Sequence, residues 1–216
     1  MKKRILILIL CVLTIGIFLS GCGENDGTKG VEAGGDAKVE AKKEYKKGTL
    51  TAESFESEYL NMKYSLPENF IMATEEEVLQ MSDLGEEVLN ADLDKYDFNK
   101  ANVVYEMMAV NQSEGQNILL MVEKLPFSNM KVDAYIEELK KELSSVENIN
   151  YTIDEEVKSK EIAGKSYSVV SVSGMDGAML QDYLIRIENG RIVAIIVTSS
   201  TEEDKDVMLN GFTTFK

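Results

Sequence analysis

Histidine is absent from the 216-residue sequence, and its absence removes several classes of enzyme from consideration. Histidine is the side chain that most often acts as a general base, and the serine and cysteine catalytic triads depend on it. Zinc sites built from histidine and cysteine are excluded on the same ground. Cysteine is also scarce, because Cys11 and Cys22 are the only two in the chain. We therefore predict no catalytic residue and no enzymatic activity.

Positive charge is in deficit, since 38 acidic residues face 23 basic ones and give a formal net charge of −15. A protein this acidic is repelled by the negative charge of nucleic acid and of an anionic lipid surface. We therefore predict no nucleic-acid partner. The charge indicates a well-solvated surface rather than an acidic recognition face.

The chain opens with a basic stretch over residues 1–4, and an apolar run follows over residues 5–19. A bilayer-spanning helix needs about 20 apolar residues, so this shorter run is typical of the core of a secretory signal. The tetrapeptide LSGC ends at Cys22, where the chain becomes polar. This arrangement resembles the lipobox of bacterial lipoproteins. The resemblance implies a signal peptide over residues 1–21, cleaved before a cysteine that carries lipid; the alternative is an uncleaved membrane anchor.

Lipid on Cys22 would hold the protein at a membrane. Each buried methylene contributes about 0.8 kcal/mol, so one acyl chain binds marginally and two hold stably. The resemblance thus implies an extracytoplasmic protein anchored to the bacterial cell membrane, with the membrane as its first partner. Once Cys22 is modified, the mature domain has no thiol for a disulfide, a nucleophile or a metal site.

The chain after the signal divides into a linker and one domain. Residues 23 to about 50 consist mainly of glycine, alanine and charged residues, and such a segment buries too little apolar surface to fold. We therefore predict a lipidated cysteine and flexible linker over residues 22–51. The remaining residues, 52–216, have the length of one ordinary domain.

Sequence patterns predict both strands and helices within residues 52–216. A hairpin is expected around Asn61, and Thr74 with Glu77 matches the capping box that begins a helix. Apolar residues recur at helical spacing from 130 to 146, and a short final helix is expected after Thr201. Strands are predicted over residues 103–111, 117–123, 153–162, 166–173, 178–188 and 191–199.

The dipeptide Asn189-Gly190 is the strongest hairpin signal, because both central residues of a type I′ turn need positive φ. A two-residue loop fixes the register and places Glu188 opposite Arg191. The predicted faces then carry Tyr183, Ile185, Ile187, Ile192 and Ile196 on one side, and Leu184, Val193, Ile195 and Val197 on the other. Apolar residues on both faces indicate a sheet that is covered on both sides. We therefore predict an α+β fold, an α/β/α sandwich with a central antiparallel sheet flanked by helices.

This order of elements resembles the PsbP-like superfamily. The likeness also includes YSLPENF around Pro67, residues 162–165 and the terminal FTTFK, and it covers about residues 52–216. It implies an α/β/α sandwich with a predominantly non-enzymatic role. No catalytic motif carries the resemblance, so it transfers no binding residue. A cystatin-like or other α+β sheet fold is the alternative.

Two short motifs resemble the signatures of known sites, but we predict that neither forms such a site. The sequence around Gly164 and Lys165 resembles the end of a phosphate-binding loop, but Ser159 stands where the loop needs its first glycine. A hairpin turn is predicted there instead. Ser128 and Lys131 match the S-x-x-K pair of penicillin-recognising enzymes, whose companion motifs are absent. Ser128 is predicted to cap the helix that follows.

Two groups of residues have the composition of a metal site. Calcium favours several oxygen ligands, which Asp92, Asp94, Asp97 and Asn99 could offer. Asp97 stands where an EF-hand requires glycine, so a solvated loop is favoured. A soft metal could use Met107, Met108 and Met121. Strand alternation places Met107 and Met108 on opposite faces, which predicts core packing. No cofactor is predicted.

We therefore expect a membrane-anchored protein whose domain binds or scaffolds a ligand or a protein partner at the cell surface. Two alternatives stay open. One is a surface hydrolase that uses a pair of carboxylates, as glycosidases do. The other is a weak calcium-binding component of the envelope.

Overall fold

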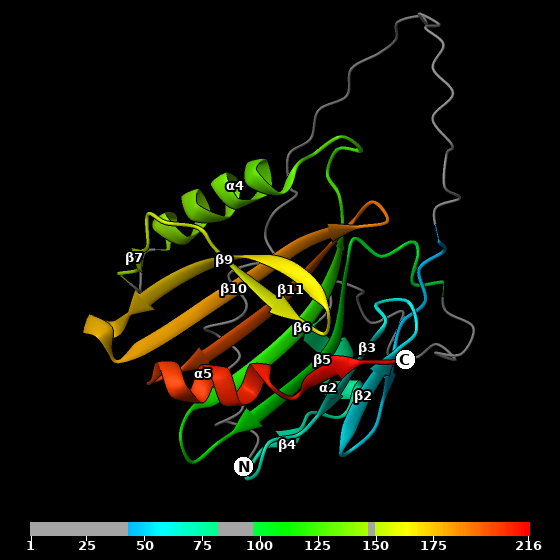
Figure 1. Ribbon diagram of the computed structural model, residues 1–216, viewed down its shortest axis with the longest axis horizontal. Coiled ribbons are helices and arrows are strands. Elements are labelled where there is room, and N and C mark those ends of the chain that lie inside the picture. Colours follow the sequence, from blue (N-terminus) through cyan, green and yellow to red (C-terminus); the bar gives the residue numbers. More distant parts are fainter. Residues whose placement is uncertain (1–42, 82–96, 147–149) are drawn as a thin grey trace, which may run out of the picture.

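A computed structural model describes residues 43–81, 97–146 and 150–216 (Figure 1). Cys22 and the predicted signal peptide lie outside these ranges. The central element is an eight-stranded sheet in the order β4-β5-β6-β11-β10-β9-β7, and β8 also pairs with β9. Its strands are β4 (Ile71–Met72), β5 (Val103–Asn111), β6 (Gln116–Lys124), β7 (Thr152–Ile153), β8 (Lys158–Ile162), β9 (Lys165–Gly174), β10 (Met179–Glu188) and β11 (Arg191–Ser199).

A second, smaller sheet has the order β1-β2-β3-β12. Its strands are β1 (Thr49–Leu50), β2 (Ser54–Ser57), β3 (Met62–Ser65) and β12 (Phe212–Thr214). The α-helices of the described ranges are α2 (Glu75–Met81), α4 (Val132–Ser145) and α5 (Glu202–Leu209). In those ranges, none of the helices is long and apolar enough to cross a membrane.

The two faces of the large sheet are covered differently. One face packs against α4 and α2, through Tyr135, Ile136, Leu139, Leu143 and Val78. The other face packs against the small sheet and α5, through Phe55, Tyr64, Phe212, Met208 and Leu209. The mostly antiparallel sheet agrees with the predicted α+β class. Helices lie on both faces, as predicted, with α4 and α2 on one side and α5 on the other. The sequence did not predict the small sheet, whose short strands β2, β3 and β12 turn alternate apolar side chains inward and add a layer on the α5 side.

The hairpin of β10 and β11 has the predicted register. Glu188 lies opposite Arg191, and Leu184 lies opposite Ile195. The turn residues Asn189 and Gly190 have φ of 51° and 77°, as a type I′ turn requires. The two predicted sets of apolar residues lie in the two separate cores on either side of the sheet.

Several element boundaries differ from the sequence prediction. The strand expected over residues 153–162 is divided into β7 and β8, with exposed residues between them. Helix α4 has Lys131 at its N-cap position, without a side-chain cap, so the capping role predicted for Ser128 is wrong. The other two caps are confirmed: the amide of Glu77 donates to Thr74 Oγ1, and the amide of Asp204 donates to Thr201 Oγ1, each at 3.2 Å.

The packed domain begins before residue 52. Tyr45 is only 3% exposed and belongs to the core beneath the small sheet, and β1 pairs with β2. Residues 23–50 are polar on average, but Tyr45, the one aromatic residue among them, is buried in the domain. The part of the predicted linker before residue 43 lies outside the described ranges.

Candidate functional site

Glu106 is a charged residue within the apolar strand β5, and a β-bulge directs its side chain into the protein. The pairing of β5 with β6 shifts register between Tyr105 and Met107. A bulge adds one residue to a strand and re-aims a side chain. Met107 packs in the core beneath the small sheet. Glu106 has no exposed surface at all and reaches the N-terminal segment that covers the same side.

Two donors from the N-terminal segment hold the Glu106 carboxyl group. The Tyr45 hydroxyl donates to Oε1 at 2.8 Å, and the backbone amide of Gly48 donates to Oε2 at 2.8 Å. Burial raises the pKa of Glu106, while the Gly48 amide, the charge of Lys47 and the Tyr45 hydroxyl act in the opposite direction. Burial and the carboxyl group raise the pKa of Tyr45, so its hydroxyl remains a donor.

Arg191 lies against the same tyrosine. Its guanidinium carbon is 4.4 Å from the centre of the Tyr45 ring, within the range of a cation–π interaction. Its Nη2 donates to Oδ1 of Asn99 at 3.4 Å, and Nδ2 of Asn99 donates to the carbonyl oxygen of Tyr45 at 3.1 Å. These contacts join the start of β11 to the N-terminal segment at the end of the sheet where β10 turns into β11 (Figure 1).

Arg186 lies on the same face of the same hairpin. It faces Val193, two residues beyond Arg191, so the two arginines are diagonal neighbours across β10 and β11. Nη1 of Arg186 pairs with Oε2 of Glu188, whose other oxygen lies 3.3 Å from Nζ of Lys165. The guanidinium carbon is 5.2 Å from the centre of the Tyr167 ring.

We call Tyr45, Glu106, Arg186, Glu188 and Arg191 the arginine cluster. Both arginines are 7% exposed. Three of their nitrogen atoms, Nε and Nη2 of Arg186 and Nη1 of Arg191, are buried without a hydrogen-bond partner among the described residues. Buried polar atoms are normally paired, so unpaired guanidinium nitrogens mark this cluster as the candidate site.

Sequence reasoning did not identify the cluster, although one signal was present. Arg4, Arg186 and Arg191 are the only arginines in the chain, and every other basic residue is lysine. Arginine is the preferred cation for buried ion pairs and for recognition of carboxylates and phosphates. Two arginines on one predicted hairpin could therefore have been nominated from the sequence.

A cavity of about 400 Å³ lies beside the cluster. Its wall consists of residues 45–50, Glu75 and residues 97–99, and it therefore includes Tyr45 and Asn99, which both contact Arg191. Glu75 and Asp97 are the carboxylates in this wall. Glu75 pairs with Lys47 at 3.0 Å, and Asp97 Oδ1 accepts from the amide of Asn99 at 3.1 Å. Both carboxylates already have partners.

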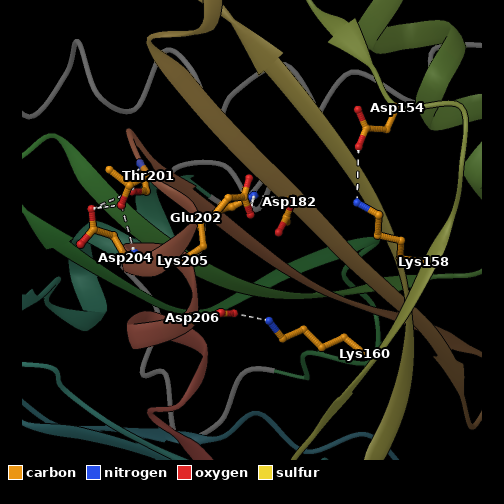
Figure 2. Close-up of polar contacts among 10 residues, drawn as sticks. Asp154, Lys158, Lys160, Asp182, Thr201, Glu202, Asp204, Lys205 and Asp206 are labelled. Atoms are coloured by element: carbon orange, nitrogen blue, oxygen red, sulfur yellow. Dashed lines mark hydrogen bonds and ion pairs between the residues drawn. The ribbon is translucent and has the colours of Figure 1, made fainter.

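A second buried ionic group joins α5 to the large sheet (Figure 2). Lys205 is 2% exposed, and its Nζ lies 2.9 Å from both Asp182 Oδ1 and Glu202 Oε2. Burial lowers the pKa of Lys205, but the hydrogen bonds and charges of the two carboxylates prevail and raise it. A lysine that is held charged is neither a nucleophile nor a base, so its role is structural.

A third buried carboxylate, Glu123 on β6, lies on the opposite side of the sheet. Its Oε2 accepts from the Tyr135 hydroxyl of α4 at 2.9 Å. Burial raises its pKa to about 7. Because Glu106 and Glu123 face different cores, they do not form the pair of carboxylates that a glycosidase-type reaction needs.

The structure also places the residues of the predicted turn and of the methionine pair. Ala163 and Gly164 have positive φ in the turn between β8 and β9, so the predicted hairpin turn is confirmed. Met107 lies in one core and Met108 in the other, as predicted.

The predicted calcium ligands are only partly described. Asn99 Oδ1 accepts from the Arg191 guanidinium, which makes this oxygen unsuitable as a calcium ligand. The described ranges contain no group of three or more Asp, Glu, His or Cys side chains that could hold a metal ion. Asp92 and Asp94 lie outside those ranges.

Comparison with known proteins gives likenesses among solved structures alone. No protein-family model matches the sequence, and no curated protein matches it. Among solved structures, the chain is similar to the solution structure of cyanobacterial PsbP (CyanoP) from Synechocystis sp. PCC 6803, with 9% identity and a TM-score of 0.46. The match covers 84% of this chain and 98% of that chain. The neighbour carries the PsbP name that the sequence resemblance predicts, but a likeness at this level transfers no ligand, partner or site residue.

Proposed function

We propose that this chain is a lipid-anchored extracytoplasmic protein whose PsbP-like domain binds a ligand or a partner without catalysing a reaction. The observation that carries the anchoring is LSGC, which ends at Cys22 where the apolar run ends. Tyr45 is 23 positions after Cys22, and an extended chain of that length spans at most about 80 Å. The domain would therefore work close to the membrane surface, at a high effective concentration for partners there.

A binding role is supported by the way in which the charged interior is arranged. Glu106 accepts two hydrogen bonds, and Lys205 is held charged by Asp182 and Glu202. Each of these groups is fixed by partners and is not placed against a second reactive group. The arginine cluster differs, because it has donors left over. A surplus of oriented donors is the property of a recognition site.

The anchoring is tested by replacing Cys22 with alanine and fractionating the cells. We expect the wild-type protein in the membrane fraction, with lipid mass on its N-terminal cysteine, and the Cys22→Ala protein outside that fraction. Replacement of Cys11 by alanine is the matched control, because that residue would leave with the signal peptide. Membrane retention of Cys22→Ala, together with an unmodified wild-type terminus, would refute the proposal.

The carboxylate-hydrolase alternative has its own test. Glu75 and Asp97 are the carboxylates of the cavity wall, so Glu75→Gln and Asp97→Asn should abolish any glycoside hydrolysis that the wild-type protein shows. A non-enzymatic domain should show no hydrolysis in the first place. Turnover that both substitutions remove would replace the binding role with an enzymatic one.

A further inference from the structure

We propose that Arg186 and Arg191 form a site for an oxyanion, the carboxylate or phosphate group of a ligand that enters at the turn end of the β10–β11 hairpin. This site rests on the proposed function only in that the domain binds a ligand, and it is independent of the lipid anchor. The proposal rests on the position of Arg186 and Arg191, whose buried guanidinium groups lie side by side on one face of the β10–β11 hairpin.

The two arginines have more donors than the protein has acceptors for them. A guanidinium group has five N–H donors and no acceptor. Arg186 uses Nη1 on Glu188 and also interacts with the Tyr167 hydroxyl, and Arg191 uses Nη2 on Asn99. Nε and Nη2 of Arg186 and Nη1 of Arg191 are buried and have no hydrogen-bond partner in the described part of the chain. An unmade hydrogen bond at a buried charged group costs more than at a neutral one, and an oxyanion supplies acceptors together with the opposite charge.

The local balance of charge also favours an anion. Arg186, Arg191 and Lys165 bring three positive charges to the hairpin end, where Glu188 is the carboxylate that touches two of them. Glu106 also interacts with the charge of Arg191, and its hydrogen bonds come from the Tyr45 hydroxyl and the Gly48 amide. Three positive charges therefore face two carboxyl groups, Glu188 and Glu106. This local excess of positive charge occurs in a chain whose formal net charge is −15. Anions are therefore repelled by most of the surface and attracted here.

The choice of arginine over lysine suits an oxyanion in particular. Lysine serves as the cation at every basic position after Arg4 except these two. The planar guanidinium fork matches a carboxylate or a phosphate in two parallel hydrogen bonds, which an ammonium group cannot do. The guanidinium carbons of Arg186 and Arg191 lie 5.2 Å and 4.4 Å from the ring centres of Tyr167 and Tyr45, within cation–π range. Each guanidinium group thus has an aromatic neighbour before a ligand arrives.

A ligand would reach the site past Glu188 and Lys165, which are more exposed than Arg186. The side chain of Glu188 is 22% exposed and that of Lys165 is 40% exposed, while Arg186 behind them is 7% exposed. Glu188 already places one carboxylate between Arg186 and Lys165. A ligand oxyanion would enter beside it and compete with it for Arg186. Neutralising Glu188 should therefore strengthen binding.

The test is calorimetric titration of the purified full-length protein in detergent with sodium phosphate and, separately, with sodium acetate. Sodium chloride at matched ionic strength is the reference. We expect saturable binding of at least one of the two anions, and comparison of the two arms distinguishes a phosphate from a carboxylate ligand. Arg186→Lys and Arg191→Lys keep the charge but lose the fork, and each should weaken binding at least tenfold.

Two further variants keep the test decisive if an arginine variant fails to fold. Glu188→Gln retains both arginines and removes the internal competitor, so it should bind the anion more tightly than the wild-type protein. Lys131→Gln removes an exposed cation at the start of α4, on the other side of the sheet, and should leave binding unchanged.

The proposal is overturned if the wild-type protein binds neither anion above the chloride reference. It is also overturned if the lysine variants keep full affinity, or if Glu188→Gln binds no more tightly. None of these results bears on membrane retention, which the Cys22 experiment measures separately.

Discussion

The Tyr45 hydroxyl lies 2.8 Å from Oε1 of Glu106, although 61 positions separate the two residues in the sequence. With the Gly48 amide on the other carboxyl oxygen, this contact fastens the N-terminal segment across β5. Because Asn99 and Arg191 also contact Tyr45, one aromatic side chain ties together the N-terminal segment, the residues before β5 and the start of β11.

Replacing Tyr45 with phenylalanine should destabilise the protein. The change leaves a fully buried carboxyl group with one donor fewer, and we expect the free energy of unfolding to fall by about 1–3 kcal/mol. Denaturation in urea, followed by circular dichroism, measures the loss. Tyr64→Phe is the matched control, because the Tyr64 hydroxyl is buried and lacks a hydrogen-bond partner in the described part of the chain. That change should be neutral or stabilising, and equal losses in the two variants would contradict the role given to Tyr45.

Replacing Gly48 with alanine should also be costly. A Cβ atom at this position would meet the ring of Phe55 and lie 2.8 Å from the carbonyl oxygen of Glu56. Phe55 is fully buried, so it has no room to move aside. We expect a loss of about 3 kcal/mol in the free energy of unfolding. Gly115, with φ of 69° and no atom within 4 Å of the place that a Cβ would take, serves for comparison. Gly115→Ala should cost about 1 kcal/mol, from backbone strain alone.

The β10–β11 hairpin could be predicted in full because two local signals agree. The Asn189-Gly190 turn sets the register, and the period-2 pattern of apolar residues then assigns both faces. The small sheet has one such signal, the hairpin predicted around Asn61, which joins β2 to β3; the rest of its pairing has none. Its strands span four residues or fewer, and β12 pairs with β3 across most of the domain sequence. Pairing of that kind depends on the whole fold and leaves little trace in a local pattern.

Sequence reasoning reaches only part of the arginine cluster, for related reasons. A bulge at Glu106 is a property of two paired strands, and the sequence of β5 alone does not reveal it. The common face of Arg186 and Arg191 does follow from the predicted register, since the first faces Val193. The burial of Arg191 does not, because Arg191 lies against Tyr45, a residue that the composition of its neighbours assigns to a linker.

The contribution of Glu123 to the stability of the protein should fall as pH rises. Burial raises its pKa in the folded protein to about 7, from an ordinary value of 4.5. The folded state therefore binds the proton more tightly than the unfolded state. This contribution is fully present below pH 4.5 and is lost as pH rises through about 7. A shift of this size corresponds to as much as about 3 kcal/mol.

Glu123→Gln should remove this contribution while keeping an oxygen that accepts from Tyr135. At about pH 8 the variant should be more stable than the wild-type protein, and near pH 4.5 the two should be alike. Urea denaturation across that range measures the difference. Tyr135→Phe should move the wild-type decline to higher pH, because the Tyr135 hydrogen bond lowers the Glu123 pKa whereas nearby Glu142 raises it. A pH-independent difference between Glu123→Gln and the wild-type protein would show that this carboxyl group does not titrate in the range.

Lys205 offers a direct comparison between a buried and an exposed ion pair on one helix. Lys205→Met leaves Asp182, whose side chain is 11% exposed, as an unpaired buried carboxylate, and should cost about 3–5 kcal/mol. Figure 2 shows the control, Lys160, which pairs with Asp206 on the same helix while the two side chains are 39% and 62% exposed. Lys160→Met should cost less than about 1 kcal/mol. Urea denaturation of each variant measures these losses.

A double variant separates the two possible causes of the Lys205→Met loss. Lys205→Met combined with Asp182→Leu should recover most of the stability, because a buried ion pair replaced as a unit by apolar groups leaves no charge without a partner. If the double variant is as unstable as Lys205→Met alone, the cost comes from lost packing around the lysine stem and not from the unpaired carboxylate.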